Sequence, residues 1–217
     1  GRLDARRTLK SLVADLRYMK ILIDAGHGIN TPGKKSPDGR LKEYEWARNI
    51  AQRLEANLKS NGYDVQRVVP EVEDISISTR CNRVNAICKQ VGPKNVILVS
   101  IHNNASGNGS WGTAKGFSVF VSKNASSNSK KLAEIFTDES IARKMTGNRS
   151  IPSCKYWTWS WTKSDIGILK NTSCPAVLTE NGFMDCKEEC DYLLSEKGKQ
   201  DFVDLHVAAI EKYIKSL

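Results

Sequence analysis

The chain has 217 residues but only three histidines, few aromatic residues (7%) and no internal repeat. No apolar run approaches the ~18 residues that a membrane-spanning helix needs, which excludes an integral membrane protein. Six cysteines are too few for a disulfide framework, so we expect buried or free thiols made in a reducing compartment. An ordinary hydrophobic fraction of 40% and the lack of a low-complexity linker favour one globular domain.

Concentrated positive charge is also missing, although the chain as a whole is basic. Lysine and arginine total 33 against 24 acidic residues, a net charge of +9. Such a balance favours polyanionic surroundings, for example nucleic acid, anionic lipid or an acidic cell wall. However, there is no long basic block and no array of aromatic and basic residues of the kind that binds single strands. We therefore predict no nucleic-acid partner.

Residues 1–18 differ from the rest of the chain and form a basic N-terminal extension in our interpretation. Apolar residues recur there at helical spacing: Leu9, Leu12, Val13 and Leu16. This pattern indicates a short amphipathic helix. The segment lacks the continuous apolar core of a signal peptide. Met19 follows directly and could be a natural start site, so we expect the catalytic domain over residues 19–217.

Strand and helix patterns alternate from residue 20 onward. Apolar or alternating runs predict five strands, at residues 20–24, 64–69, 95–101, 117–121 and 175–180. Apolar residues at helical spacing predict four helices, at residues 46–58, 77–91, 132–145 and 202–213. This alternation predicts an α/β fold, a single domain with a mostly parallel twisted sheet and helices on both faces.

Four side chains with catalytic chemistry fall at the ends of these predicted elements. His27 directly follows the first strand, His102 ends the buried strand 95–101, and Glu180 ends the last strand. Glu43 begins the first helix, just after the loop that follows His27. Because ligands of open α/β sheets bind beyond the carboxyl ends of the strands, we expect these four side chains at one rim.

Two histidines and one carboxylate are a common ligand set for catalytic zinc. The ion lowers the pKa of its bound water from ~15.7 to about 7, and a carboxylate that is not a ligand can move the proton. We predict His27, Glu43 and His102 as zinc ligands and Glu180 as the catalytic base. On chemistry alone, Glu43 and Glu180 could exchange roles. Taken singly, each residue also has a structural interpretation, and we assign the third histidine, His206, a structural role.

The segments around these side chains form five motifs. They are Ile23-Asp24-Ala25-Gly26-His27-Gly28, Glu43 with Asn49-Ile50-Ala51-Gln52-Arg53-Leu54, Ser76-Ile77-Ser78-Thr79-Arg80, Ser100-Ile101-His102-Asn103-Asn104, and Leu178-Thr179-Glu180-Asn181-Gly182-Phe183. In order and spacing, residues 20–214 resemble the zinc-dependent N-acetylmuramoyl-L-alanine amidases of the amidase-3 family. The sequence departs from the family pattern at Ala25, where a proline is usual, and in the unmatched segment 146–165.

The resemblance implies a peptidoglycan hydrolase that cleaves the amide bond between N-acetylmuramic acid and L-alanine with zinc-activated water. It also implies that His27, Glu43 and His102 bind Zn²⁺, that Glu180 is the catalytic carboxylate, and that peptidoglycan is the partner. We expect a monomer that acts at the cell wall or in the periplasm. Without a signal peptide, the chain resembles a phage-type endolysin that stays in the cytoplasm until cell lysis; a secreted enzyme without its leader is the other interpretation.

Two rival functions are weighed against the amidase interpretation. A zinc carboxypeptidase or aminopeptidase would share the ligand chemistry, although the Glu-Asn-Gly-Phe context at Glu180 fits the amidases better. A non-catalytic cationic wall-binding module would need none of the four side chains at the strand and helix ends, so we favour an enzyme.

Two further features have both a functional and a structural interpretation. The alternating residues Trp157, Trp159 and Trp161 could stack on sugar rings or line a peptide groove, or they could pack their segment onto the core. For Arg80 we expect an ion pair with a carboxylate of the scaffold.

Overall fold

A computed structural model describes residues 18–148, 151–158 and 165–217. The predicted N-terminal helix therefore lies outside the described residues, as do Trp159 and Trp161. Among the described residues, none of the helices combines the length and the apolar character that crossing a bilayer requires. All six cysteines are free thiols, and five of them are buried.

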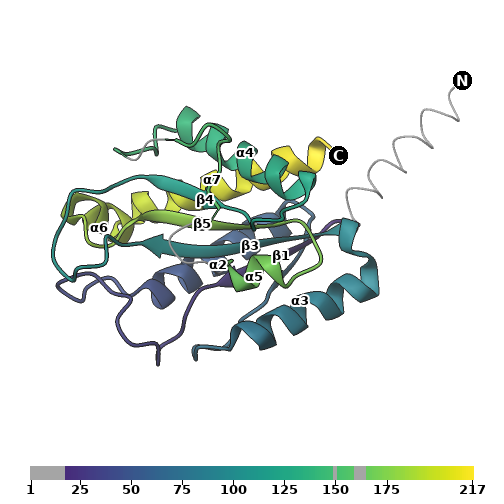
Figure 1. The fold of residues 1–217 in the computed structure, drawn as a ribbon, viewed down its shortest axis with the longest axis horizontal. Coiled ribbons are helices and arrows are strands. Elements are labelled where there is room, and N and C mark those ends of the chain that lie inside the picture. Colours follow the sequence, from purple (N-terminus) through teal and green to yellow (C-terminus); the bar gives the residue numbers. More distant parts are fainter. Residues whose placement is uncertain (1–17, 149–150, 159–164) are drawn as a thin grey trace, which may run out of the picture.

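The centre of the structure is a five-stranded sheet (Figure 1). Its strands are β1 (Lys20–Ala25), β2 (Asp64–Arg67), β3 (Val96–Asn104), β4 (Phe117–Phe120) and β5 (Ala176–Phe183). They lie in the order β2-β1-β3-β5-β4. The first four in this order are parallel, and only the edge strand β4 runs antiparallel to its neighbour β5. The mostly parallel sheet predicted from the sequence is thus confirmed.

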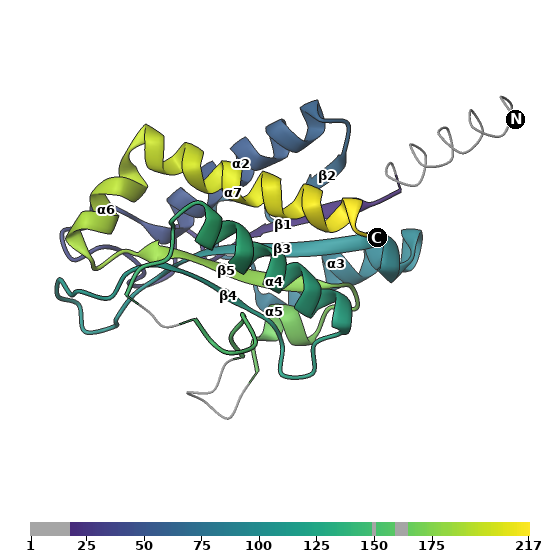
Figure 2. The same cartoon turned by 90° about the horizontal axis from the view of Figure 1, so that it is seen from above.

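Helices cover both faces of this sheet. They are α2 (Glu43–Ser60), α3 (Ile77–Val91), α4 (Ser127–Ala142), α5 (Gly167–Lys170), α6 (Lys187–Leu194) and α7 (Glu196–Lys215), with a short 3₁₀ turn η1 (Pro93–Asn95). The larger core lies between the sheet and α2, α4, α6 and α7, and the smaller core lies between the sheet and α3 and α5. Figure 2 shows α4 and α7 side by side over the strands.

The helix boundaries differ from the predicted ones where capping residues decide them. Helix α4 begins at Ser127 rather than Leu132, because the Ser126 hydroxyl accepts a hydrogen bond from the Ser129 N–H and caps the helix. The final helical region is longer than predicted and is divided in two, since Ser195 ends α6 and caps α7 through the Gly198 N–H.

Side chains along the strands alternate between the two cores. Ile21 and Ile23 of β1 pack in the larger core, whereas Leu22 between them packs in the smaller one. Burial on both faces is typical of parallel strands in α/β proteins. The same alternation turns Ser100, His102 and Leu98 of β3 toward the α3 face, so the polar residues follow the apolar one toward the carboxyl end of the strand.

Candidate metal centre

Three of the four predicted site residues converge at the carboxyl end of the sheet. The Glu43 Oε2 atom lies 2.5 Å from His27 Nε2 and 3.4 Å from His102 Nδ1. One ligand atom from each residue lies within 4.8 Å of the other two. The two imidazole rings meet edge to face, with centroids 5.1 Å apart. Metal–ligand bonds to nitrogen and oxygen are roughly 2 Å long, so one ion can contact all three atoms after small adjustments.

The first histidine is presented by a tight Gly26-His27-Gly28 turn after β1. His27 has a left-handed backbone (φ 60°), which is uncommon for a residue with a side chain. The turn passes so close to the second histidine that a Cβ on Gly26 would lie 2.2 Å from His102 Cε1. A Cβ on Gly28 would lie 1.9 Å from the Asp74 backbone nitrogen. Both glycines are therefore required for the approach of the turn to its neighbours.

Two arginines hold this turn through its carbonyl groups. Arg80 donates to the carbonyl oxygens of Ala25 (2.6 Å) and His27 (3.0 Å). Arg48 donates to the carbonyls of Gly26 (3.2 Å) and His27 (2.8 Å). The shared contact on the His27 carbonyl fixes the uncommon backbone conformation of this residue. Sequence reasoning missed Arg48.

Arg80 also forms the ion pair expected from the sequence. Its side chain is almost fully buried and pairs with Asp24 at 2.8 Å and with Asp74 at 3.1 Å. A buried arginine needs such partners, because an unpaired charge in the protein interior is costly. Arg80 is therefore part of the scaffold that supports the site.

A hydrogen-bonded chain runs behind the second histidine. The His102 Nε2 atom lies 3.1 Å from Ser100 Oγ, and Ser100 donates to Asp24 Oδ2 at 2.6 Å. Since Nδ1 faces Glu43, a proton on Nε2 can be donated to the serine, which leaves the Nδ1 lone pair directed into the centre. Partners of this kind orient metal-binding histidines and fix their tautomer.

The position of Ser100 and Asp24 follows from strand register, which the sequence does not show. Asp24 of β1 is the register partner of Ser100 on β3, and Ser100 lies two residues before His102 on the same strand face. The available signal was a polar residue within each of two buried apolar strands, because such residues are rare unless they are hydrogen-bonded.

The electrostatics of the centre favour an anionic Glu43. Burial alone would raise the pKa of Glu43, but the neighbouring His102 and His27 imidazoles outweigh it and hold this pKa at about 2. Burial likewise lowers the pKa of His102, and the charge of Glu43 more than reverses that effect. Glu43 Oε2 is buried without a conventionally oriented hydrogen-bond donor among the described residues. A buried carboxylate oxygen aimed between two imidazoles is a suitable environment for a cation.

The fourth predicted residue, Glu180, lies beside this group of three. It is the register partner of His102 on the adjacent strand β5 and therefore lies on the same face of the sheet. Its negative charge also contributes to the raised pKa of His102. Within the described part of the chain, the candidate ligand cluster comprises His27, Glu43 and His102 without Glu180. Of the two exchangeable glutamates, the structure groups Glu43 with the histidines.

The remaining histidine and the described tryptophan of the alternating segment lie elsewhere. His206 is buried on α7, where Nδ1 donates to the Phe202 carbonyl and Nε2 lies 2.9 Å from Thr179 Oγ1. Trp157 forms backbone hydrogen bonds with Val119 and Val121 beside β4, and its side chain packs against the smaller core. These contacts agree with a structural role for His206 and with the packing interpretation of Trp157.

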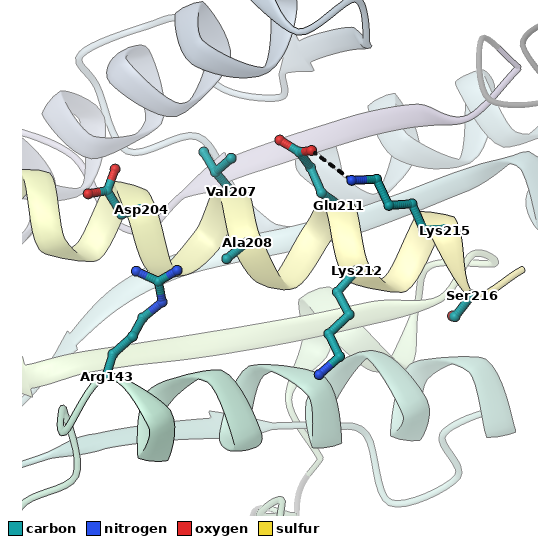
Figure 3. Close-up of a pocket in the computed structure, with 8 residues that line it drawn as sticks. All are labelled: Arg143, Asp204, Val207, Ala208, Glu211, Lys212, Lys215 and Ser216. Carbon is teal, nitrogen blue, oxygen red and sulfur yellow. Dashed lines mark ion pairs between the residues drawn. The ribbon is translucent and has the colours of Figure 1, made fainter.

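A large open groove lies on the other face of the sheet, between α4 and α7 (Figure 3). Its charged side chains include Lys215, which is 3.6 Å from Glu211, and Lys212, which is 3.8 Å from Glu139. Since these charges are already paired and face away from the metal centre, we assign the groove no part in the site.

Comparisons with known proteins place the chain among relatives of known family and fold. A family model described as N-acetylmuramoyl-L-alanine amidase matches residues 21–212. The chain is 27% identical over 204 residues to an endolysin of Bacillus phage SPP1, covering 89% of this chain but only 65% of the endolysin. It therefore spans just under two thirds of that relative.

Solved structures show the same fold. An N-acetylmuramoyl-L-alanine amidase from Clostridium difficile 630 has a TM-score of 0.74 and 27% identity, covering 92% of this chain and 98% of its own. The amidase Ami1 from Mycobacterium smegmatis has a TM-score of 0.78 and 20% identity, covering 93% and 99%. At 20% identity, the second comparison carries the fold alone.

Proposed function

The chain belongs to the N-acetylmuramoyl-L-alanine amidase family, and we propose that it hydrolyses the amide bond between the lactyl group of N-acetylmuramic acid and L-alanine in peptidoglycan. The convergence of His27, Glu43 and His102 at the carboxyl end of the sheet is the observation that carries this proposal. We assign the activity to residues 19–217, which include the whole family match.

The three converging residues are the proposed ligands of a zinc ion. Two imidazoles and one carboxylate suit Zn²⁺, and the low pKa of Glu43 supplies a negative charge at neutral pH. The Oε2 atom of Glu43 is buried and accepts no hydrogen bond from the described residues, so it would be available to such an ion. A zinc ion held by these three residues would polarise the amide carbonyl and would lower the pKa of the attacking water to about 7.

Glu180 is the proposed proton carrier of the reaction. Its carboxylate accepts a proton from the attacking water while the water oxygen bonds to the amide carbon. As the carbon–nitrogen bond breaks, Glu180 returns this proton to the nitrogen of L-alanine. The products are a lactyl carboxylate on the sugar and a peptide with a free amino terminus. Positioned proton transfer of this kind contributes about 10²–10⁴-fold to a rate.

Analysis of digested cell wall tests this proposal. Purified peptidoglycan is incubated with the zinc-loaded chain, and the products are identified by mass spectrometry together with an assay for new amino groups. We expect peptides that begin with a free L-alanine and glycan strands without peptides. Release of single amino acids from the stem peptide would instead identify a peptidase, and binding without cleavage would identify a wall-binding module.

We further propose that the protein acts on the cell wall as a monomer in phage-type lysis. The similarity to a phage endolysin supports this location. The net charge of +9 favours adhesion to an anionic envelope. Sedimentation of the purified chain and lysis of susceptible cells from outside and from within would test these two points.

A further inference from the structure

A second feature of the site is a cavity of about 240 Å³ that opens directly beside the metal centre. His27 lines both the cavity and the centre. The other polar side chains around the cavity are Thr31, Lys34, Lys35, Lys42 and Tyr44. A group bound in this cavity would therefore lie next to a group bound at the metal.

The cavity carries three positive charges that nothing in the described structure neutralises. Lys34, Lys35 and Lys42 are exposed, and no acidic side chain is among the described residues that line the cavity. Nearby Arg40 behaves differently, since it is paired with Asp38 at 2.6 Å and with Asp191 at 2.6 Å. The three lysines are therefore available to a negatively charged ligand.

Two acidic groups near this loop already have partners of their own. Asp38 accepts hydrogen bonds from Arg40 and Ser36, and Asp74 accepts from Thr31 and Arg80. Glu43 faces the two metal-site histidines. Since no acidic side chain is among the described residues that line the cavity, opposite charge would attract an anionic ligand into it.

The backbone that carries the lysines is held in a fixed relation to the centre. The loop that carries them closes through an antiparallel bridge between Lys35 and Lys42, and the Ser36 N–H donates to the Leu41 carbonyl at 2.8 Å. The Glu43 N–H donates to the Lys34 carbonyl at 3.0 Å. One short loop therefore leads from the lysines directly into a proposed metal ligand.

We propose that this lysine cavity binds a free carboxylate of the stem peptide and so places the peptide side of the substrate over loop 28–42. The inference rests on the proposed amidase function. The N-acetylated sugars on one side of the cleaved bond are uncharged, whereas the peptide on the other side carries carboxylates. Of the two sides, only the peptide is chemically complementary to three unpaired lysines.

Two soluble substrates test the inference with the zinc-loaded full chain. Both are muramoyl dipeptides, and the α-carboxylate of their second amino acid is either free or amidated. We expect the free carboxylate to give the lower KM. In the triple variant Lys34→Gln/Lys35→Gln/Lys42→Gln this preference should disappear. The KM for the free form should rise roughly tenfold, because several individually weak, exposed charge contacts are lost together. The kcat values should change little.

Two control variants separate this effect from general loss of charge or folding. The variant Lys131→Gln/Lys212→Gln/Lys215→Gln removes the same charge near the groove between α4 and α7 and should retain the preference. A triple lysine-to-arginine variant of the cavity should retain it as well.

Three results would overturn the inference. First, the wild type could have the same KM for both substrates. Second, the cavity variant could show an equally raised KM for both substrates. Third, the cavity variant could be impaired only on cell walls that carry phosphate polymers. The last result would identify a contact with wall polymers instead. Failure of the proposed function is distinguishable, because the wild type would then cleave neither substrate.

Discussion

Two histidines on opposite faces of the sheet show how one residue type acquires two different properties. His102 faces the α3 side and lies 3.4 Å from the Glu43 carboxylate. His206 is enclosed on the α7 side, where its hydrogen-bond partners are the uncharged Thr179 hydroxyl and the Phe202 carbonyl. The two imidazoles are separated by the sheet itself, since Thr179 and Glu180 are consecutive residues of β5.

Burial acts in the same direction on both side chains, but the outcome differs. It lowers the pKa of His206 to about 4, so that this imidazole is neutral at any physiological pH. The pKa of His102 is raised, because the charges of Glu43 and Glu180 outweigh burial. The nearby carboxylates, rather than burial, therefore distinguish the proposed metal ligand His102 from the structural His206, and each prediction below changes one side of this contrast.

Removal of a proposed metal ligand on the α3 side of the sheet should have the largest effect. In His102→Ala, we expect zinc content to fall from one ion per chain to near zero and amidase activity to become undetectable, because only two ligands remain. Zinc is measured by elemental analysis and activity by amine release. His206→Gln is the matched control on the α7 side of the sheet and should retain both zinc content and amidase activity. Full zinc content in His102→Ala would remove this residue from the ligand set.

Loss of the proton carrier should separate catalysis from metal binding. Glu180→Gln preserves the size of the side chain but cannot accept the proton, so we expect turnover to fall at least ~10²-fold with zinc content unchanged. The exposed Glu188→Gln variant is the control for loss of one negative charge. Activity close to that of the wild type would assign the base to another group.

His206, enclosed on the α7 side of the sheet, should affect the pH dependence of stability. The pKa of His206 is about 4 in the folded protein and about 6.5 when unfolded, so the unfolded chain binds more protons between these values. The contribution of His206 to the free energy of unfolding is therefore fully present above pH 6.5. It is lost as the pH is lowered toward 4, and the loss amounts to about 3 kcal/mol.

Denaturant unfolding of the metal-free protein at pH 7 and pH 4.5 measures this loss. The wild type should lose more stability than His206→Gln, and their difference isolates His206 from the other titrating groups. Equal losses in the two proteins would show that His206 titrates normally.

Much of this arrangement could be predicted because it follows from local sequence patterns. The alternation of apolar strands and helices predicts the sheet, and the positions of His27, His102 and Glu180 at strand ends place them at one rim. Helix boundaries were less accurate where single capping serines decide them, as Ser126 does for α4 and Ser195 does for α6 and α7.

Apart from Arg80, the residues that support the site could not be predicted, because they depend on strand register and on long side chains that reach across the fold. Ser100 contacts Asp24 only because β1 and β3 are aligned at these positions. Arg48 extends from α2 to carbonyl groups of the turn after β1. Neither relation leaves a periodic signal in the sequence, whereas the chemical type of the metal-site residues is visible in it.

The smallest effect we expect concerns the hydrogen bond behind His102. Ser100→Ala removes the link between His102 Nε2 and Asp24 but leaves the buried ion pair of Asp24 with Arg80 in place. Because such partners orient a metal-binding imidazole, zinc affinity should fall roughly 10- to 100-fold, measured by competition with a chelator of known affinity.

Ser118→Ala is the matched control for this substitution. Ser118 is another buried serine of the sheet, and its hydroxyl lacks a hydrogen-bond partner among the described residues. Its loss should therefore leave zinc affinity unchanged. If both variants bind zinc as the wild type does, His102 is oriented by packing against Gly26 alone, and the polar chain behind it serves only the stability of the strands.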